Sequence, residues 1–300
     1  MTENRDTPQG LAFALAAYGL WGFLPLYMKL LSHIPAAEVV THRILWSLPI
    51  AGALLILMRR TGDIRTALRT PKTLAMGVLT AALVSLNWGI YVWAIVSDRA
   101  LDAALGYYIN PLFSIFLGAA LLRERLAPLQ WAAITLAAAA VVILTLDNGA
   151  VPWAALSLTL TWGFYAFFKK SLPIGPNQGF LLEVLILTPP ALAYLAWLTA
   201  TGQSHFSTTP DVALLLGCGV VTAVPLLLYA NGAKLLRLST IGILQYIAPT
   251  MIMLIGVFIF DEPFGRARMI AFPMIWAALV LYSIAMLRQL RRKAKAKAKA

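Results

Sequence analysis

The chain has 300 residues, of which 60% are hydrophobic and only 12% are charged, and its mean hydropathy is +0.79. Soluble domains carry about 25% charged and about 45–50% apolar residues, so this composition excludes a water-soluble globule and predicts a polytopic membrane protein whose solvent is the lipid bilayer. The formal net charge of +12 does not indicate a nucleic-acid partner, because 7 of the 24 Lys and Arg residues lie in the last 13 positions and most others lie between apolar runs.

Ten apolar stretches, each long enough to cross a bilayer, follow one another along the chain. A membrane-spanning helix needs about 20 mainly apolar residues, and these runs are continuous rather than alternating, which favours helices over strands. The connections between them are expected to be short loops, as at Arg59–Asp63. The sequence therefore predicts an all-α protein with ten transmembrane helices, at 9–30, 36–58, 73–96, 100–122, 127–147, 150–170, 178–200, 211–233, 240–260 and 265–287.

Lys and Arg residues are distributed unequally between the two sets of loops. With a cytoplasmic N-terminus, the inner segments hold 19 of these cations and the outer ends of the spans hold four. Cytoplasmic loops of membrane proteins carry an excess of Lys and Arg. The sequence therefore predicts that both termini lie in the cytoplasm.

The chain also contains an internal repeat of five spans. At an offset of 138 residues, positions 91–124 align with 229–262 without a gap, and seven pairs are identical, mostly of uncommon residue types. Because five is an odd number, the second copy must enter the membrane from the opposite face, so the repeats are inverted. Inverted repeats are the architecture of alternating-access transporters. We expect a first repeat at 1–148, a second at 149–287 and a basic cytoplasmic tail at 288–300.

Short motifs from both halves occur in order and at consistent spacing. They are Trp21-Gly22, Thr41-His42-Arg43, Asn87-Trp88, Gly106-Tyr107-Tyr108-Ile109-Asn110-Pro111 and Gln245-Tyr246-Ile247-Ala248-Pro249-Thr250. Over about residues 8–287 the chain resembles the EamA-type members of the drug/metabolite transporter superfamily, and within them the RarD group. The resemblance implies ten helices in two EamA repeats and the transport of a small solute across the bacterial inner membrane, but it does not name the solute.

Polar and aromatic residues of several spans fall at one depth in the membrane. Arg43 lies seven residues past the outer start of its span, about 10 Å deep at about 1.5 Å per residue. An ionisable residue inside the membrane is costly and predicts a function, and a guanidinium presents a planar fork to a carboxylate or phosphate. We therefore predict a substrate site formed by Trp21, Arg43, Asn87, Trp88, Tyr107, Tyr108, Asn110, Trp162, Gln245 and Tyr246.

Some of these residues also have a purely structural interpretation. Aromatic residues at helical spacing often belong to a bundle core, and Arg43 could pair with Glu38 or with backbone carbonyls. The unperturbed pKa of a histidine lies near neutrality, so His42 is a candidate for proton coupling, together with Glu38 and Glu183. Glu183, near the inner end of its span, could instead be an interfacial carboxylate that reaches water.

Three further residues are predicted to act on the backbone. Pro111 and Pro249 occupy equivalent positions of the two repeats, and we expect them to be matched hinges. Glu262, like Glu124 in the first repeat, follows the end of its span and is expected to tie a loop to a helix terminus.

The sequence contains no H-E-x-x-H, Walker or G-x-S-x-G motif, so neither an enzyme nor ATP-driven transport is predicted. The lone Cys218 excludes an intrachain disulfide and a Cys-rich metal site, and no cofactor or metal is expected. The predicted function is secondary transport or export of small metabolites or drugs by alternating access, with the oligomeric state left open, a monomer included. The alternative is an intramembrane enzyme or lipid-handling protein in which His42 acts with Glu38 or Glu183, which would have to converge within hydrogen-bond reach.

Overall fold

The computed structural model describes residues 7–122, 126–232, 235–236 and 238–297. Within these ranges the regular structure is helical throughout, which confirms the all-α prediction. The helices are α1 (Pro8–Leu30), α2 (Ala36–Leu57), α3 (Gly62–Arg69), α4 (Pro71–Val96), α5 (Ala100–Leu122), α6 (Pro128–Asn148), α7 (Trp153–Lys170), α8 (Pro176–Ala200), α9 (Thr209–Gly232), α10 (Leu238–Leu244), α11 (Ile247–Phe258) and α12 (Arg266–Lys297).

Eight of the described helices are long and apolar enough to cross a membrane: α1, α2, α4, α5, α6, α8, α9 and α12. Their outward surfaces carry large apolar side chains, and Leu57, Leu146 and Met269 are 81%, 78% and 61% exposed. An apolar surface of this kind is unsuited to water and suited to lipid. The chain is therefore a multi-pass membrane protein.

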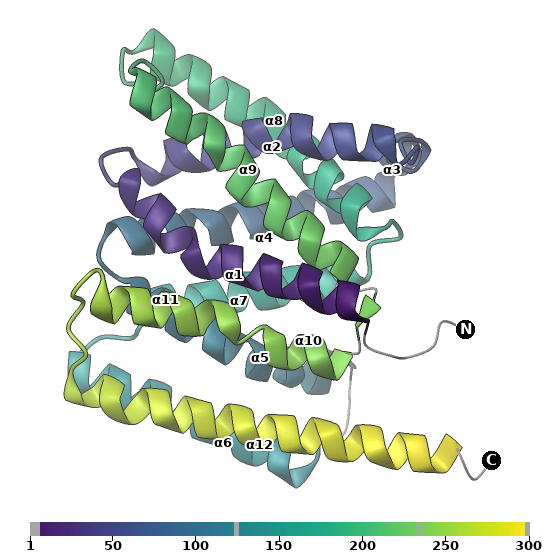
Figure 1. The fold of residues 1–300 in the computed structure, drawn as a ribbon, viewed down its shortest axis with the longest axis vertical. Helices are drawn as coiled ribbons and strands as arrows, with labels where there is room; N and C mark the ends of the chain where they lie inside the picture. The colour runs from purple at the N-terminus through teal and green to yellow at the C-terminus, as the bar shows by residue number, and fades with distance from the viewer. Residues whose placement is uncertain (1–6, 123–125, 233–234, 237, 298–300) are drawn as a thin grey trace.

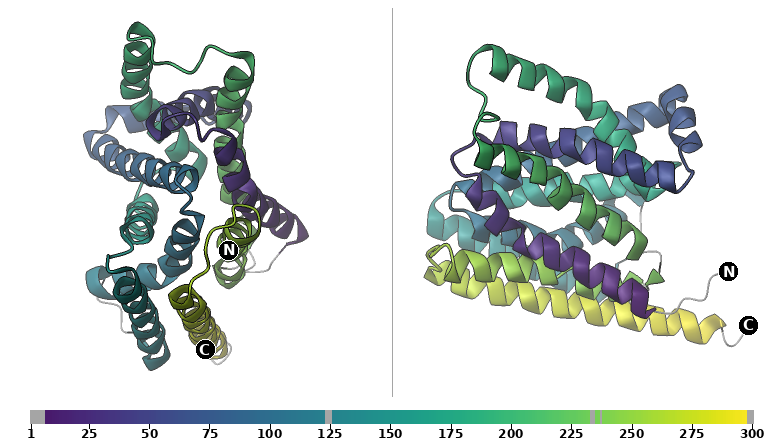
Figure 2. Two further views of the ribbon diagram at one scale, coloured as in Figure 1. Left: turned by 90° about the vertical axis from the view of Figure 1, so that its left-hand side faces the viewer. Right: turned by 45° about the horizontal axis from the view of Figure 1, so that its top comes forward.

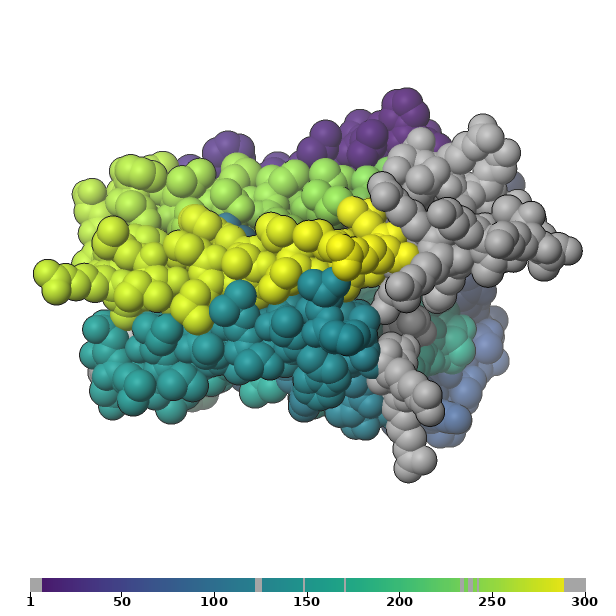
Figure 3. All heavy atoms as spheres, turned by 90° about the horizontal axis from the view of Figure 1, so that it is seen from below, coloured from purple at the N-terminus to yellow at the C-terminus, as the bar shows by residue number. Residues whose placement is uncertain are grey.

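The helices run side by side across the molecule in two layers. In the view of Figure 1, α1, α9, α11 and α12 form the nearer layer, and α4, α7 and α6 lie behind them; the left view of Figure 2 shows the two layers nearly end-on. α1 packs against α9 and α11 in one layer, while α7 packs against α4 and α5 in the other. α6 and α12 lie against each other at one edge of the bundle (Figure 3).

The backbone differs from the sequence-based expectation in three places. The expected loop after the second span contains α3, whose Ile64 and Ala67 are buried. The expected span at 240–260 is broken at Gln245 and Tyr246 into α10 and α11. The break has a physical reason, because Pro249 lacks an N–H and its ring clashes with the carbonyl four residues earlier. The third difference is that α12 continues to Lys297, since the tail consists of good helix formers without Gly or Pro.

The two predicted hinge prolines therefore have different surroundings. Pro249 lies in the first turn of α11, directly after the break, whereas α5 continues as a helix through Pro111. Of these two equivalent spans, the helix is therefore interrupted in the second, between α10 and α11, and continuous in the first, α5. A hinge role for either proline stays a prediction.

Glu262 joins the loop after α11 to the start of α5. Its carboxylate oxygens accept hydrogen bonds from the backbone N–H groups of Ala100 and Leu101, which begin α5. Burial raises the pKa of the Glu262 carboxyl above its ordinary value, and the two N–H donors act in the opposite direction. The expected tie between loop and helix is confirmed for Glu262, whereas Glu124 lies outside the described residues.

We predict that Glu262→Ala lowers the melting temperature of the purified protein. The change leaves two buried N–H groups without an acceptor, and each costs about 1–3 kcal/mol. Thermal unfolding followed by intrinsic fluorescence measures the effect. Asp147→Ala, which removes an exposed carboxylate at the end of α6, is the control, and equal melting temperatures for the two variants would contradict the prediction.

Candidate functional site

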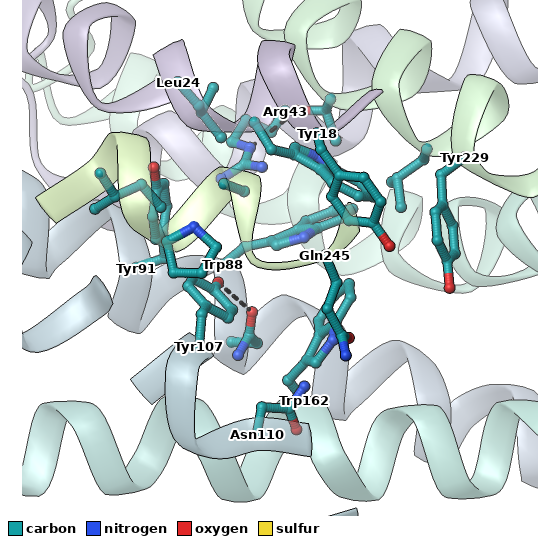
Figure 4. Close-up of a pocket in the computed structure, with 17 residues that line it drawn as sticks. Tyr18, Leu24, Arg43, Trp88, Tyr91, Tyr107, Asn110, Trp162, Tyr229 and Gln245 are labelled. Atoms are coloured by element: carbon teal, nitrogen blue, oxygen red, sulfur yellow. Dashed lines mark hydrogen bonds between the residues drawn. The ribbon is translucent and has the colours of Figure 1, made fainter. Parts of the chain in front are cut away.

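A cavity of about 130 Å³ lies between the two layers of the bundle (Figure 4). Its walls come from α1, α2, α9 and α11 on one side and from α4, α5 and α7 on the other. One water molecule needs roughly 10–15 Å³ measured in this way. The cavity therefore has room for several waters or for one small solute.

Eight of the ten residues predicted to bind substrate line this cavity. They are Trp21, Arg43, Asn87, Trp88, Tyr107, Asn110, Trp162 and Gln245. The first six come from the first half of the chain and the last two from the second, so the cavity lies between the halves. Depth in the membrane was thus enough to identify residues that share one space.

Tyr108 and Tyr246 do not line the cavity. The Tyr108 hydroxyl lies 2.7 Å from Oγ1 of Thr250, and its ring packs edge-on against Phe272 of α12. Tyr108 follows Tyr107 on α5, and successive residues of a helix point about 100° apart. Tyr246 is similarly adjacent to Gln245 and packs against the apolar core. The depth of these two tyrosines fits the site, but their direction does not.

Arg43 enters the cavity as a buried cation. Its side chain is 3% exposed, its Nε donates to Oγ1 of Thr222 at 2.9 Å, and its guanidinium carbon lies 4.9 Å from the centre of the Trp88 ring. Among the described residues, no carboxylate forms an ion pair with Arg43, and its Nη1 has no hydrogen-bond partner. The guanidinium therefore retains an unused donor beside the cavity (Figure 4).

Glu38 is not the partner of Arg43, which corrects one of the two structural alternatives. The Glu38 carboxylate is fully buried and pairs with His205, whose Nδ1 lies 2.7 Å from Oε2 and whose backbone N–H donates to Oε1 at 2.8 Å. His205 belongs to the loop between α8 and α9. The hydrogen-bond partner of the Glu38 carboxylate at the start of α2 is thus His205 and not Arg43.

Two asparagines of the cavity differ in their hydrogen bonding. Asn87 donates to Oγ1 of Thr161 at 2.9 Å and to a backbone carbonyl, and it accepts from the Tyr107 hydroxyl at 3.1 Å (Figure 4). Asn87 therefore holds Tyr107 in place. The Oδ1 of Asn110 is buried and has no partner among the described residues. Asn110 can accept a hydrogen bond from a bound molecule.

Three tyrosines of the cavity wall were missed by the sequence reasoning: Tyr18, Tyr91 and Tyr229. The rings of Tyr18, Trp21 and Tyr229 lie within 5.6–5.9 Å of one another, centre to centre. Two signals could have identified them. Tyr18 precedes Trp21 by three residues and so shares its helix face, and Tyr91 aligns with Tyr229 in the internal repeat.

The candidate coupling residues do not converge. The His42 ring accepts from Trp46 Nε1 at 3.0 Å and stacks on Phe206, while its Nε2 has no partner among the described residues. Glu183 pairs with Lys169 at 2.7 Å and is 1% exposed, so the interpretation of Glu183 as an interfacial carboxylate in water is wrong. No described hydrogen bond joins His42 to either carboxylate, so the enzyme alternative lacks the acid–base geometry that it requires.

Comparisons with known proteins agree with the membrane architecture. The EamA-like transporter family matches the chain twice, over residues 8–146 and 150–284. The chain is 40% identical over 294 residues to Protein RarD of Streptomyces exfoliatus, covering 97% of this chain and 93% of that protein. It is 40% identical over 284 residues to an uncharacterized transporter of Vibrio cholerae, covering 94% of each protein. It is 37% identical over 295 residues to Protein RarD of Escherichia coli (strain K12), covering 98% of this chain and 100% of that protein. A protein crystal structure with a TM-score of 0.60 and 20% identity covers 91% of this chain and 96% of its own, and shows a likeness of fold alone.

The close approach of α5 to α7 at Gly106 leads to a prediction. A Cβ at Gly106 would lie 2.6 Å from the carbonyl oxygen of Ala155, so Gly106→Ala forces the helices apart and displaces the neighbouring Tyr107. Overpacking of this kind costs about 1–3 kcal/mol, and we expect a lower melting temperature. Gly89→Ala is the control, because a Cβ at Gly89 meets nothing within 4 Å. A Gly106→Ala protein as stable as the control would refute the prediction.

Proposed function

Because the chain belongs to the EamA-like transporter family, we propose that it is a secondary transporter that moves small amphipathic anions across the bacterial inner membrane by alternating access. The family and the names of its relatives support the coarser statement, a bacterial membrane transporter. The proposal that the solute is an anion rests on the unpaired Arg43 in the central cavity.

Charge favours an anion as the solute. Arg43 is the one charged side chain among the described residues that line the cavity. A buried charge without a partner is strongly unfavourable, and an incoming carboxylate or phosphate would compensate it through the unused Nη1 donor. A cationic solute would find no carboxylate in this wall.

The rest of the wall favours a solute with an apolar or aromatic part. The rings of Trp21, Trp162 and Tyr229 offer faces and edges on which a planar group can pack. Asn110 supplies a hydrogen-bond acceptor at a distance from Arg43, at the opposite side of the cavity in Figure 4. A small aromatic carboxylate combines the features that this lining accommodates.

The helix packing supports two inverted five-span repeats. Exchanging each helix with its counterpart turns the contacts of α1 with α9 and α11 into those of α7 with α4 and α5, and both sets are present. The two family matches also divide the chain near residue 148. We propose that α7, and α10 with α11 together, complete ten crossings, and that the halves rock about the central cavity.

We predict that Arg43→Lys folds but transports poorly. A lysine keeps the charge and loses the planar fork, and hydrogen bonds to charged groups contribute roughly 1.5–3 kcal/mol, so affinity should fall about 10- to 100-fold. Uptake of labelled mandelate, an aromatic carboxylate, into proteoliposomes measures the loss, with the neutral mandelamide as the matched probe and Lys72→Ala, an exposed cation, as the control variant.

Arg43→Ala separates binding from structure. Since Arg43 has no carboxylate partner, its removal strands no buried charge, and we expect a wild-type melting temperature without mandelate uptake. An active Arg43→Ala protein would remove Arg43 from the proposed site. Wild-type protein that does not move mandelate would overturn the proposed solute class.

The proposed topology predicts opposite exposure of two equivalent positions. Cysteines introduced at positions 99 and 237 of a Cys218→Ala chain should react with a membrane-impermeant maleimide from the outside and from the cytoplasm, respectively. Position 237 lies outside the described residues. Its expected exposure follows from its alignment with position 99 in the internal repeat, so the labelling experiment tests that repeat. Labelling of both positions from one side would contradict inversion.

A further inference from the structure

A second cavity, of about 490 Å³, adjoins the central one. The two cavities share Trp162, Leu226 and Tyr229 as wall residues, and the second is also lined by Tyr165 and Lys169. It lies toward the C-terminal end of α7, which is the end of the bundle where α1 begins and α12 ends (Figure 1). In the proposed topology, this vestibule opens toward the cytoplasm.

An ion pair lies in the wall of the vestibule. Lys169 Nζ is 2.7 Å from Glu183 Oε1, and the Tyr165 hydroxyl donates to the other carboxylate oxygen at 3.2 Å. The Nζ also lies 5.4 Å from the centre of the Tyr165 ring. The side chain of Glu183 is 1% exposed, whereas that of Lys169 is 19% exposed. The amine of Lys169 is itself buried against Glu183, and the partly exposed stem of the lysine lines the vestibule.

Gly179 makes room for the arm of Lys169. A Cβ at Gly179 would lie 3.0 Å from Nζ and 3.1 Å from Cε of Lys169. The lysine stem therefore passes directly over the backbone of α8, and its amine is turned onto Glu183. A lysine has a compact charge on a flexible four-carbon stem, so a modest rotation can move the amine from Glu183 into the vestibule.

We propose that Lys169 is a second anion site, which receives the carboxylate of the solute in the vestibule and lies on its route to Arg43. This inference rests on the proposed function, because it assumes an anionic solute. Two cations then serve one solute in sequence, Lys169 at the entrance and Arg43 in the central cavity. Trp162 and Tyr229 form the partition between them.

The binding of the anion at Lys169 is linked to the uptake of a proton. If Lys169 turns to the solute, the carboxylate of Glu183 is left buried without its counter-charge, which is unfavourable. Protonation of Glu183 from the cytoplasmic solution removes that charge, and the Tyr165 hydroxyl remains as its hydrogen-bond partner. One anion and one proton thus bind together, and the net charge of the site is the same before and after.

Few titratable groups lie near Glu183 among the described residues. The titratable groups that contact it are Lys169 and Tyr165 of α7, with Tyr229 of α9 next to Tyr165. α3 presents Asp63 to the first turn of α8, more than one helical turn before Glu183. The described contacts of α2 and α4 with this half of α8 involve uncharged residues, Met58 and Gly77.

The test uses the full-length protein in proteoliposomes, with labelled mandelate as the probe and an internal pH dye. Glu183→Gln should retain mandelate exchange at equal pH but lose accumulation driven by a proton gradient and the accompanying pH change. The double variant Lys169→Gln with Glu183→Gln strands no charge, so it should fold. Its KM for mandelate in exchange should rise about tenfold or more, whereas mandelamide transport stays unchanged.

The matched control neutralises the exposed ion pair of Lys29 and Asp98 by Lys29→Gln with Asp98→Asn, and it should behave as wild type. A double Lys169/Glu183 variant with wild-type KM and wild-type proton coupling would overturn the second anion site while leaving the proposed function intact. Wild-type protein that fails to move mandelate overturns both, so the two failures are distinguishable.

Discussion

The energetic cost of a charge in an apolar interior organises this molecule. Glu38 accepts a hydrogen bond from the backbone N–H of His205, Glu183 pairs with Lys169, and Glu262 accepts hydrogen bonds from two backbone N–H groups at the start of α5. Arg43 is the exception, because it is buried and has only a hydroxyl and a ring as described partners. An ionisable residue inside the membrane is costly and commonly marks a functional site, which is why the proposed substrate site is placed in the central cavity.

The internal repeat explains why this centre lies where it does. Each half contributes helices to both walls, and the equivalent residues Tyr91 of α4 and Tyr229 of α9 line opposite walls of the cavity. Glu38 and Glu183 both lie near the start of the second long helix of a repeat and are both buried, but Glu38 contacts His205 whereas Glu183 pairs with Lys169. The halves therefore share a framework, while the partners of these two carboxylates differ.

Much of the fold could be predicted from the sequence, because the length of each apolar run, and the polar, Gly and Pro residues between the runs, determine where a membrane helix begins and ends. α3 escaped prediction because it has only eight residues, too few to cross a membrane, although Ile64, Ala67 and Leu68 recur at helical spacing. Most of the cavity followed from depth alone, but depth does not specify direction, and Tyr108 was misplaced for that reason. The partner of Glu38 could not be predicted at all, because His205 is 167 residues away in a loop.

The interruption between α10 and α11 has a consequence for the field inside the cavity. Ala248 and Pro249, in the first turn of α11, line the cavity, so the positive end of that helix dipole faces it, equivalent to roughly half an elementary charge. This potential comes from peptide groups and is independent of side-chain identity. The proposed preference for negative charge would therefore come partly from the main chain, where substitution of a single residue cannot erase it.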